Sequence, residues 1–295
     1  MQILDGKIVS RAVMDQLKAK VEELIAAKKR VPHLSVIIIG SNGACETYVA
    51  SKIKNCEEIG FKSSLVRLEE TVAESALIET INKLNEDDAI DGILLQLPLP
   101  KHINEQKITS LIDYSKDVDG FNPISMGNLA LGVPSFIPAT PFGIMLMLEY
   151  YNIETSGKHA VVIGRSNIVG RPISMLLSQN STYGNCTVTV CHSRTTNIKE
   201  HCLNADIIVT ALGIPGFLKA DMVKENAVVI DVGITRIKDT SKKSGYSIKG
   251  DVDFENVAPK CSCITPVPGG VGLMTIAAVL QNTYNAYLQR NSSCQ

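Results

Sequence analysis

Two residues with reactive side chains, Tyr48 and Lys52, lie four positions apart in "TYVASKIK", a segment with helical periodicity. Residues four apart are neighbours on one helix face, so we expect the phenol and the ammonium group to lie close together. The apolar stripe of this helix consists of Val49, Ile53 and Cys56, and the pair lies at its edge. Spacing alone favours a lysine whose stem covers the stripe and whose charge reaches water. A catalytic lysine would instead be buried beside a partner.

Polar residues also interrupt two later apolar segments. Gln96 in "GILLQLPLP" ends a predicted strand, where α/β sheets tend to place ligand contacts. A buried amide there needs hydrogen-bond partners, such as a buried lysine or a polar ligand. Asp117 and Asp119 in "KDVDGFNP" precede a glycine, and a hydrated turn is the simplest interpretation of that pattern.

A third segment, "ITPVPGGVGLMT" at 264–275, contains two prolines and three glycines between a predicted strand and a helix. Prolines restrict the backbone, and glycines let it approach a flat ligand closely. This loop is therefore a candidate wall of a binding site.

The segment "VVIGRSNIVGRP" at 161–172 follows a predicted strand and opens a helix, as in a dinucleotide-binding turn. The N–H groups of a helix N-terminus and its partial positive charge suit a pyrophosphate. Gly164 and Gly170 match the glycine pattern, but Ser166 occupies the place of its second glycine. As a bare motif, this turn is equally compatible with any α/β protein.

The next predicted strand helps to choose the cofactor. It leads into His192, Ser193 and Arg194, where NAD-binding units usually carry an acidic residue for the ribose hydroxyl. An arginine can donate two parallel hydrogen bonds to a phosphate. The missing acid, together with Arg165 in the preceding turn, favours NADP over NAD.

The elements that position these residues alternate along the chain. Apolar runs predict strands at 33–40, 63–68 and within "IDGILLQLP", with helical patterns at 44–59 and 74–85. A helix with Thr140 as its N-cap leads to five more strand-like runs from residue 159 and a final helix. This alternation predicts parallel sheets and an α/β fold. The lysine-rich stretch 237–250 is interpreted as a solvated loop.

Composition excludes several protein classes. The net charge of the 295 residues is −1, which argues against binding to nucleic acid or to an anionic membrane. No apolar run is long enough for a transmembrane helix, and the first residues lack a secretory-signal pattern. The eight cysteines contain no C-x-x-C pair, so we expect reduced cysteines, no metal site and a cytoplasmic protein.

Seven segments occur together in an order that is more specific than any one of them. They are "TYVASKIKNCEEIGF", "DGILLQLPLP", "KDVDGFNP", "IPATPFGIM", "HAVVIGRSNIVGRP", "CHSRTTN" and "TPVPGGVG". In order and approximate spacing, over nearly the whole chain, this set resembles the bifunctional methylenetetrahydrofolate dehydrogenase/methenyltetrahydrofolate cyclohydrolase family.

The resemblance implies an α/β protein of two domains with a cleft between them. Residues 1–140 with the C-terminal helix 276–295 would form a folate-binding catalytic domain, and residues 141–275 a Rossmann-like NADP-binding domain. The implied activities are NADP-dependent oxidation of 5,10-methylenetetrahydrofolate to 5,10-methenyltetrahydrofolate, and hydrolysis of that product to 10-formyltetrahydrofolate. The implied assembly is a homodimer.

The resemblance also implies roles for individual residues. The catalytic positions are Tyr48, Lys52, Gln96 and Asp119. The folate contacts are Tyr48, Gln96, Asp119, Pro268, Gly269 and Gly270. The cofactor contacts are Gly164, Arg165, Ser166, Ile168, Ser193, Arg194, Gly213 and Ile234. Hydride transfer mainly requires positioning, whereas hydrolysis requires proton transfer, which a buried lysine oriented by Gln96 could perform.

The sequence departs from the usual family pattern at six positions, and Leu273 in the glycine-rich loop replaces a proline. The other five are Gly43, Cys45, Asn122, Ser125 and Ala139. Three alternatives stay open: a monofunctional dehydrogenase using NAD or NADP, a shikimate-type dehydrogenase, and a non-catalytic NADP-binding protein. Retention of Lys52 and Gln96, with the missing acid near Ser193, argues against the first, and Tyr48, Gln96 and "KDVDG" together argue against the second. The third predicts cofactor binding without turnover, which an activity assay separates from the enzymatic interpretation.

Overall fold

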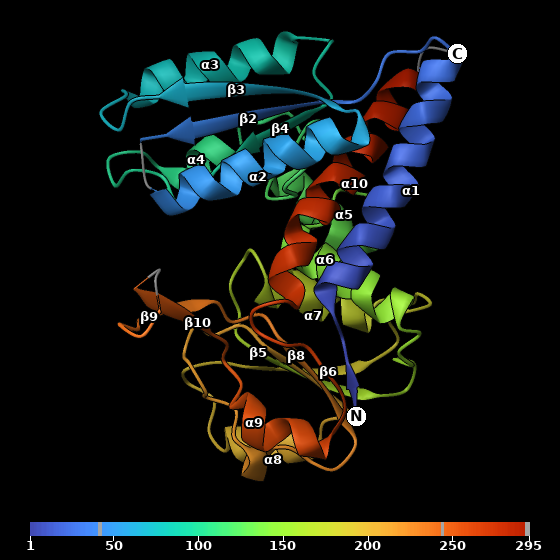
Figure 1. Ribbon diagram of the computed structural model, residues 1–295, viewed down its shortest axis with the longest axis vertical. Coiled ribbons are helices and arrows are strands. Elements are labelled where there is room, and N and C mark those ends of the chain that lie inside the picture. Colours follow the sequence, from blue (N-terminus) through green and yellow to red (C-terminus); the bar gives the residue numbers. More distant parts are fainter. Residues whose placement is uncertain (41–42, 243–244, 293–295) are drawn as a thin grey trace. The chain divides into compact units, whose positions relative to one another are not determined.

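The computed structural model describes residues 1–40, 43–242 and 245–292, which divide into two compact units (Figure 1). The N-terminal unit comprises Arg11–Ala139 and Ile276–Gln295, and the C-terminal unit comprises Met1–Ser10 and Thr140–Thr275. The first ten residues therefore group with the C-terminal unit, which differs from the expected domain limits. The reason is that Leu4 donates a backbone hydrogen bond to Ile264 (2.8 Å).

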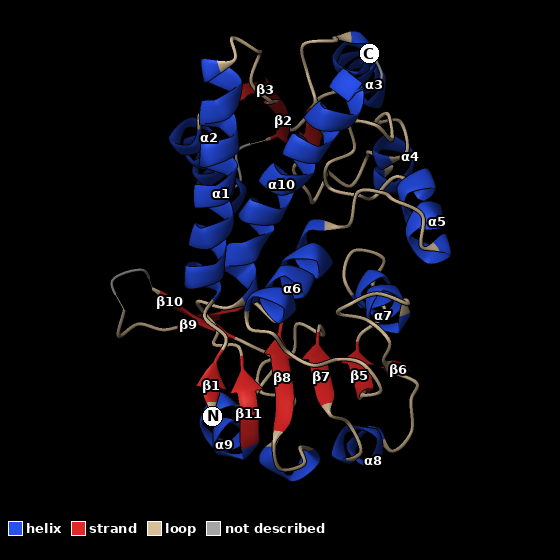
Figure 2. Ribbon diagram, turned by 90° about the vertical axis from the view of Figure 1, so that its right-hand side faces the viewer, coloured by secondary structure: helices blue, strands red, loops and turns tan. Residues whose placement is uncertain are grey.

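The N-terminal unit contains a parallel three-stranded sheet in the order β3-β2-β4. Its strands are β2 (His33–Ile39), β3 (Lys62–Leu68) and β4 (Gly92–Leu95). Its helical elements are α1 (Gly6–Ala26), α2 (Gly43–Ile59), α3 (Glu74–Glu86), α4 (Glu105–Thr109), α5 (Pro123–Leu131) and α10 (Val271–Ser292), of which α1 and α10 each begin in the C-terminal unit. Helices α2 and α3 lie on opposite faces of this sheet (Figures 1 and 2). On one face, Leu77 and Ile81 of α3 pack on Ile37, Ile93 and Leu95, because strand residues alternate between faces.

The C-terminal unit contains a parallel six-stranded sheet in the order β1-β11-β8-β7-β5-β6 (Figure 2). Its strands are β1 (Gln2–Ile3), β5 (His159–Ile163), β6 (Thr187–Cys191), β7 (Ile207–Thr210), β8 (Ala227–Asp231) and β11 (Cys261–Ile264). Its α-helices are α6 (Ala139–Tyr150), α7 (Gly170–Ser178), α8 (Ile198–Leu203) and α9 (Phe254–Val257). The chain order reverses between β5 and β7, and α/β sheets bind ligands at such a switch point.

Most expected elements are present within a residue or two of their predicted limits, two expectations about these elements were wrong, and one strand was missed. Helix α6 begins at Ala139, so Thr140 lies inside it rather than capping it. Strand β1 was not expected, because its two residues are too few to show periodicity. The lysine-rich stretch is not a plain loop, because β9 (Thr235–Lys238) and β10 (Tyr246–Lys249) form an antiparallel hairpin.

No helix in the described part of the chain is long and apolar enough to cross a membrane. The six cysteines of that part whose side chains are described are all buried and unbonded to one another.

The turn at Asp117 is not hydrated, contrary to the simplest interpretation of its sequence. Asp117 is 1% exposed and forms an isolated parallel bridge with Ile93. Its carboxylate accepts hydrogen bonds from the Asn122 N–H (2.7 Å) and the Ser125 hydroxyl (3.3 Å). Gly120 closes the turn at φ +71°, where a Cβ atom would lie 2.7 Å from the Pro138 nitrogen. Burial raises the pKa of Asp117 to about 7, and the charge of Asp119 contributes.

This pKa predicts a pH-dependent stability. Between the usual value of 3.8 and about 7, the folded protein holds a proton on Asp117 that the unfolded chain releases. The contribution of Asp117 to the free energy of unfolding therefore falls as pH rises through this window and is constant above it. Asp117→Asn cannot titrate, so the stability of the wild type relative to this variant should fall by about 3 kcal/mol between pH 5 and pH 8. Urea unfolding at four pH values measures this, and a constant difference would contradict it.

Candidate active site

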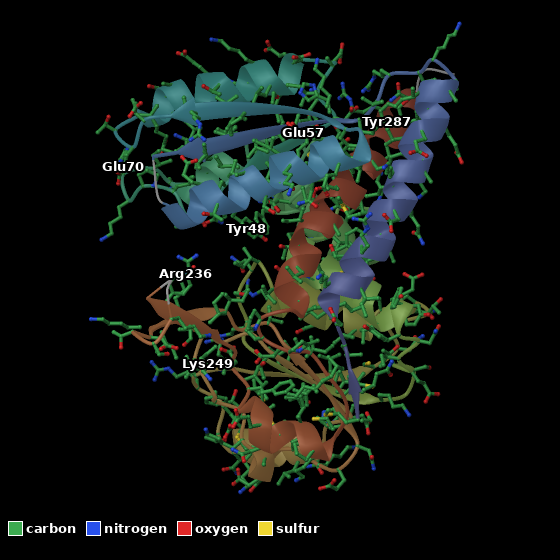
Figure 3. The ribbon with its side chains drawn as sticks, in the orientation of Figure 1. Tyr48, Glu57, Glu70, Arg236, Lys249 and Tyr287 are labelled. Carbon is green, nitrogen blue, oxygen red and sulfur yellow. The ribbon has the colours of Figure 1, made fainter. Side chains whose placement is uncertain are left out.

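Lys52 is buried, with 5% of its surface exposed, so the charged group does not reach water as its spacing had favoured. Its ammonium group donates a hydrogen bond to the Gln96 side-chain oxygen at 3.2 Å. It also lies 4.7 Å from the centre of the Tyr48 ring, close enough for a cation–π interaction. Helix α2 supplies Tyr48 (Figure 3) and Lys52 on one face.

Gln96 is held in the orientation that this contact requires. It directly follows β4, and its backbone N–H donates to the Ile37 carbonyl at 2.9 Å, which continues the pairing with β2. Its side-chain amide nitrogen donates to the Leu97 carbonyl at 2.8 Å. The amide oxygen is consequently the end that faces Lys52. The sequence prediction of a strand-end glutamine next to a lysine is reproduced in this geometry.

Asp119 adds a carboxylate to the same group of residues. The side chain is half-buried, and burial raises its pKa while the charge of Lys52 opposes that effect. Within the described part of the chain, no hydrogen bond ends on its carboxylate. Both oxygens are thus available to accept N–H groups from a ligand.

Together these four side chains offer a flat aromatic surface, an amine oriented by an amide, and a free carboxylate. All four come from the N-terminal unit. An amine in this setting can exchange a proton with a ligand, and the carboxylate can accept two neighbouring N–H donors. Which ligand atoms they contact stays a prediction.

The predicted cofactor turn lies at the switch point of the C-terminal sheet. Gly164 follows β5 at φ +129°, and a Cβ atom there would lie 2.4 Å from the Ala211 carbonyl oxygen, just beyond β7. At Gly170 a Cβ atom would lie 2.2 Å from the Gly164 carbonyl oxygen. Only glycine permits this close strand-to-helix packing, which a dinucleotide turn requires. The Ser166 hydroxyl accepts hydrogen bonds from the Val169 and Gly170 N–H groups at 3.2 and 3.3 Å.

Exposed cations and hydroxyl groups surround this turn. Ile163 and Cys191 are register partners at the ends of β5 and β6, so Arg165 and Ser193 leave the same edge of the sheet. Arg165, Ser166, Ser193 and Arg194 are exposed, as is Ile168. Neither guanidinium group forms an ion pair with any residue that the structure describes. These residues fit a phosphorylated dinucleotide.

Two buried carboxylates that sequence reasoning missed hold the loops of Gly213 and Ile234, which were predicted to contact the cofactor. Asp251 accepts hydrogen bonds from the Leu212 and Gly213 N–H groups at 2.6 and 3.1 Å. Asp231 accepts from the N–H groups of Gly233 and Asp251, both at 2.9 Å. Burial raises the pKa of Asp231. The available signals were that Asp231 ends the apolar run "VVID" two residues before Gly233, and that Asp251 directly follows Gly250.

A pocket of about 180 Å³ in the C-terminal unit brings together two predicted sets of residues. Ile234, assigned to the cofactor, lines it together with Pro268, Gly269 and Gly270, which were assigned to the folate. The assignment of each set to its ligand stays a prediction.

The departures from the family pattern have local explanations. The Asn122 side chain accepts the Ile124 N–H at 2.8 Å and caps α5, and Ser125 donates to Asp117. Ala139 begins α6, and Leu273 is 42% exposed and lines the pocket. The side chains at positions 43 and 45 lie outside the described residues. No group of three or more potential metal ligands occurs in the described part of the chain.

Comparison with known proteins identifies relatives of the whole chain. A family model described as "Tetrahydrofolate dehydrogenase/cyclohydrolase, catalytic domain" matches residues 4–119. A second, "Tetrahydrofolate dehydrogenase/cyclohydrolase, NAD(P)-binding domain", matches residues 138–291, and so includes most of α10.

Similar full-length proteins agree with these matches. The bifunctional protein FolD of Flavobacterium johnsoniae is 59% identical over 99% of both chains. The structure of the bifunctional enzyme FolD from Campylobacter jejuni has a TM-score of 0.92 and 47% identity, covering 98% of this chain and 99% of that one. The Trypanosoma brucei dehydrogenase-cyclohydrolase, solved with NADP and an inhibitor, has a TM-score of 0.91 and 37% identity over 97% of both chains. The chain therefore belongs to the tetrahydrofolate dehydrogenase/cyclohydrolase family.

Proposed function

We propose that this protein catalyses two successive reactions: NADP-dependent oxidation of 5,10-methylenetetrahydrofolate, and hydrolysis of the resulting 5,10-methenyltetrahydrofolate to 10-formyltetrahydrofolate. The observation that carries the proposal is the buried Lys52 amine, which contacts Gln96 and Tyr48 and lies within the electrostatic influence of Asp119. A dehydrogenase alone would not need such an amine, because hydride transfer depends on positioning. Hydrolysis does need such an amine, because a proton must leave the attacking water and another must reach the departing nitrogen.

In the hydrolysis, water adds to the cationic carbon between the two folate nitrogens, and one C–N bond then breaks. Lys52, in its neutral amine form, accepts a proton from the attacking water, and the resulting ammonium group returns that proton to the departing nitrogen. Gln96 fixes the direction of the amine, and the Tyr48 ring forms a flat wall against the ligand. The Asp119 carboxylate accepts hydrogen bonds from the amino and ring N–H groups of the pterin.

In the oxidation, NADP supplies the hydride acceptor when it is bound. The loops after β5 and β6 would hold it, with Arg165, Ser193 and Arg194 directed at the 2′-phosphate. Asp251 and Asp231 keep the loops of Gly213 and Ile234 in place. We assign residues 1–140 with 276–295 to the folate-binding domain and residues 141–275 to the NADP-binding domain, with the first residues pairing with β11 of the latter.

We further propose that the protein is a cytoplasmic homodimer. The edge of β3, on the side away from β2, carries no strand in the described part of the chain, and unpaired strand edges support association. The unbonded cysteines suit a reducing compartment.

The cofactor preference can be measured directly. With 5,10-methylenetetrahydrofolate as substrate, kcat/KM for NADP should exceed that for NAD by at least about tenfold, because two arginines are available for charge-assisted hydrogen bonds to the 2′-phosphate. Methenyl absorbance reports the product of oxidation. Equal efficiencies with the two cofactors would refute the assignment, and cofactor binding without turnover would refute the enzymatic function.

Lys52→Met should abolish methenyltetrahydrofolate hydrolysis, a loss of at least about a hundredfold, while much of the dehydrogenase activity survives. Both rates can be read in one spectrophotometer with purified protein. Lys54→Met, on the same helix but with a side chain 74% exposed, is the matched control and should leave both rates unchanged. Hydrolysis at the wild-type rate in Lys52→Met would remove Lys52 from the mechanism.

The dimer predicts a mass near twice the 31.9 kDa of one chain. Sedimentation equilibrium over a range of micromolar concentrations measures it. A single species at the mass of one chain throughout that range would contradict the proposal.

A further inference from the structure

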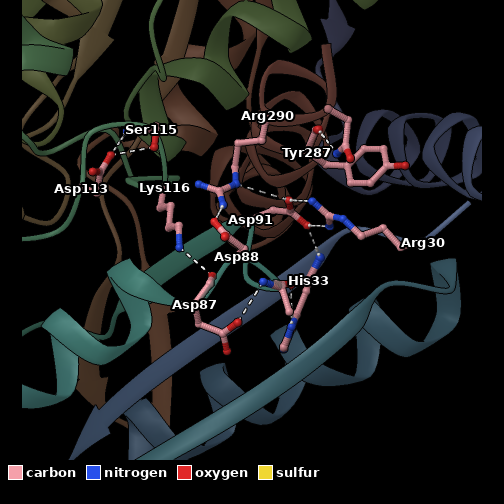
Figure 4. Close-up of polar contacts among 12 residues, drawn as sticks. Arg30, His33, Asp87, Asp88, Asp91, Asp113, Ser115, Lys116, Tyr287 and Arg290 are labelled. Carbon is pink, nitrogen blue, oxygen red and sulfur yellow. Dashed lines mark hydrogen bonds and ion pairs between the residues drawn. The ribbon is translucent and has the colours of Figure 1, made fainter. Parts of the chain in front are cut away.

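Lys116, in the turn that leads to Asp119, is one of the largest fully buried side chains, with 1% of its surface exposed. Its ammonium group donates hydrogen bonds to the carbonyl oxygens of Leu84 (3.0 Å), Asn85 (2.6 Å) and Asp87 (2.8 Å). Figure 4 shows Lys116 pointing toward Asp87 beside Arg290. The three N–H donors of the ammonium thus meet three carbonyl acceptors.

Those carbonyls belong to the C-terminal end of α3. The last carbonyls of a helix lack partners within the helix and carry a partial negative charge. Among the described residues, no carboxylate forms an ion pair with Lys116, so the helix end itself compensates the buried charge. Burial lowers the pKa of Lys116, and the nearby Arg290 acts in the same direction. The charges of Asp88, Asp87 and Asp113 oppose this effect from a distance.

The backbone of Lys116 is fixed on its other side. Its carbonyl oxygen accepts the Ile93 N–H of β4 at 2.8 Å and the Val118 N–H at 2.9 Å. One residue therefore joins the end of α3 to the sheet strand that leads into Gln96.

The rest of the turn is held by different partners. Asp117 binds the start of α5 through the Asn122 N–H. The Asn282 side chain of α10 donates to the Val118 carbonyl at 2.9 Å. Asp119 follows directly. Within the described part of the chain its carboxylate accepts no hydrogen bond, and the charge of Lys52 acts to lower its pKa. The direction of that carboxylate is consequently set by how residues 116–118 are anchored.

We propose that Lys116 is a positioning residue for the folate site, which holds the Asp119 carboxylate in its ligand-binding position by fixing the turn to the end of α3. This inference rests on the proposed role of Asp119. Lys116 itself touches neither substrate nor cofactor.

The test is a double-mutant cycle with Lys116→Met and Asp119→Asn, read as the dissociation constant of 5-formyltetrahydrofolate, a stable reduced folate, by calorimetry. Lys116→Met alone should weaken binding about tenfold, because the carboxylate loses its alignment. In the Asp119→Asn background the same change should have little further effect. In steady-state assays Lys116→Met should raise KM for the folate and leave KM for NADP unchanged, a separation that general destabilisation does not produce.

Arg30→Met is the matched control. Arg30 forms a two-pronged ion pair with the fully buried Asp91 (2.6 and 2.7 Å) and stacks on Tyr287, in the same cluster of polar contacts (Figure 4). Its loss should lower the urea midpoint without changing folate affinity. Lys116→Gln, which keeps two N–H donors for the helix end, serves if Lys116→Met does not fold, and should show a smaller loss of the same kind.

The outcomes separate the two proposals. If either Lys116 variant weakens folate binding by equal factors in both backgrounds, or leaves it unchanged, the positioning role is overturned alone. If Asp119→Asn binds the folate as tightly as the wild type, the role of Asp119 fails and this inference fails with it.

Discussion

The buried ammonium group of Lys52 is the constraint on which the candidate site depends. Removing a charge from water is costly unless other groups replace the lost hydration. Here the Tyr48 ring and the Gln96 side-chain oxygen replace part of the hydration of Lys52. Tyr48 is fixed by α2, and Gln96 is fixed by the last backbone hydrogen bond between β4 and β2. The sheet and its helix therefore determine where a proton can be exchanged.

Other buried charges are also compensated by fixed neighbouring groups, and in these cases the groups belong to the backbone. In the N-terminal unit the carbonyls ending α3 compensate the Lys116 ammonium. In the C-terminal unit, backbone N–H groups compensate the carboxylates of Asp231 and Asp251. Backbone groups cannot rotate away as side chains can, so each buried charge also fixes the geometry of the loop that surrounds it.

The alternation of strands and helices could be predicted from the sequence, because apolar runs and helical periodicity are local signals. The burial of Lys52 could not be, since spacing describes only its own helix and Gln96 lies 44 residues away. The burial of Asp117 could not be predicted either, because it depends on a bridge to Ile93, which is distant in the sequence. The β9–β10 hairpin was missed because exposed lysines in a two-stranded ribbon look like a loop. Family resemblance supplied the site residues that physical patterns alone left ambiguous.

Leu273 carries a consequence for molecules designed to bind this protein. It places a branched, partly exposed apolar side chain on the wall of the pocket beside Gly269 and Gly270, where the family usually has a rigid proline ring. A leucine can change rotamer to enclose a small apolar substituent, whereas a proline ring cannot. A ligand that carries such a substituent is therefore accommodated at this wall by a rotamer change that a proline ring does not allow.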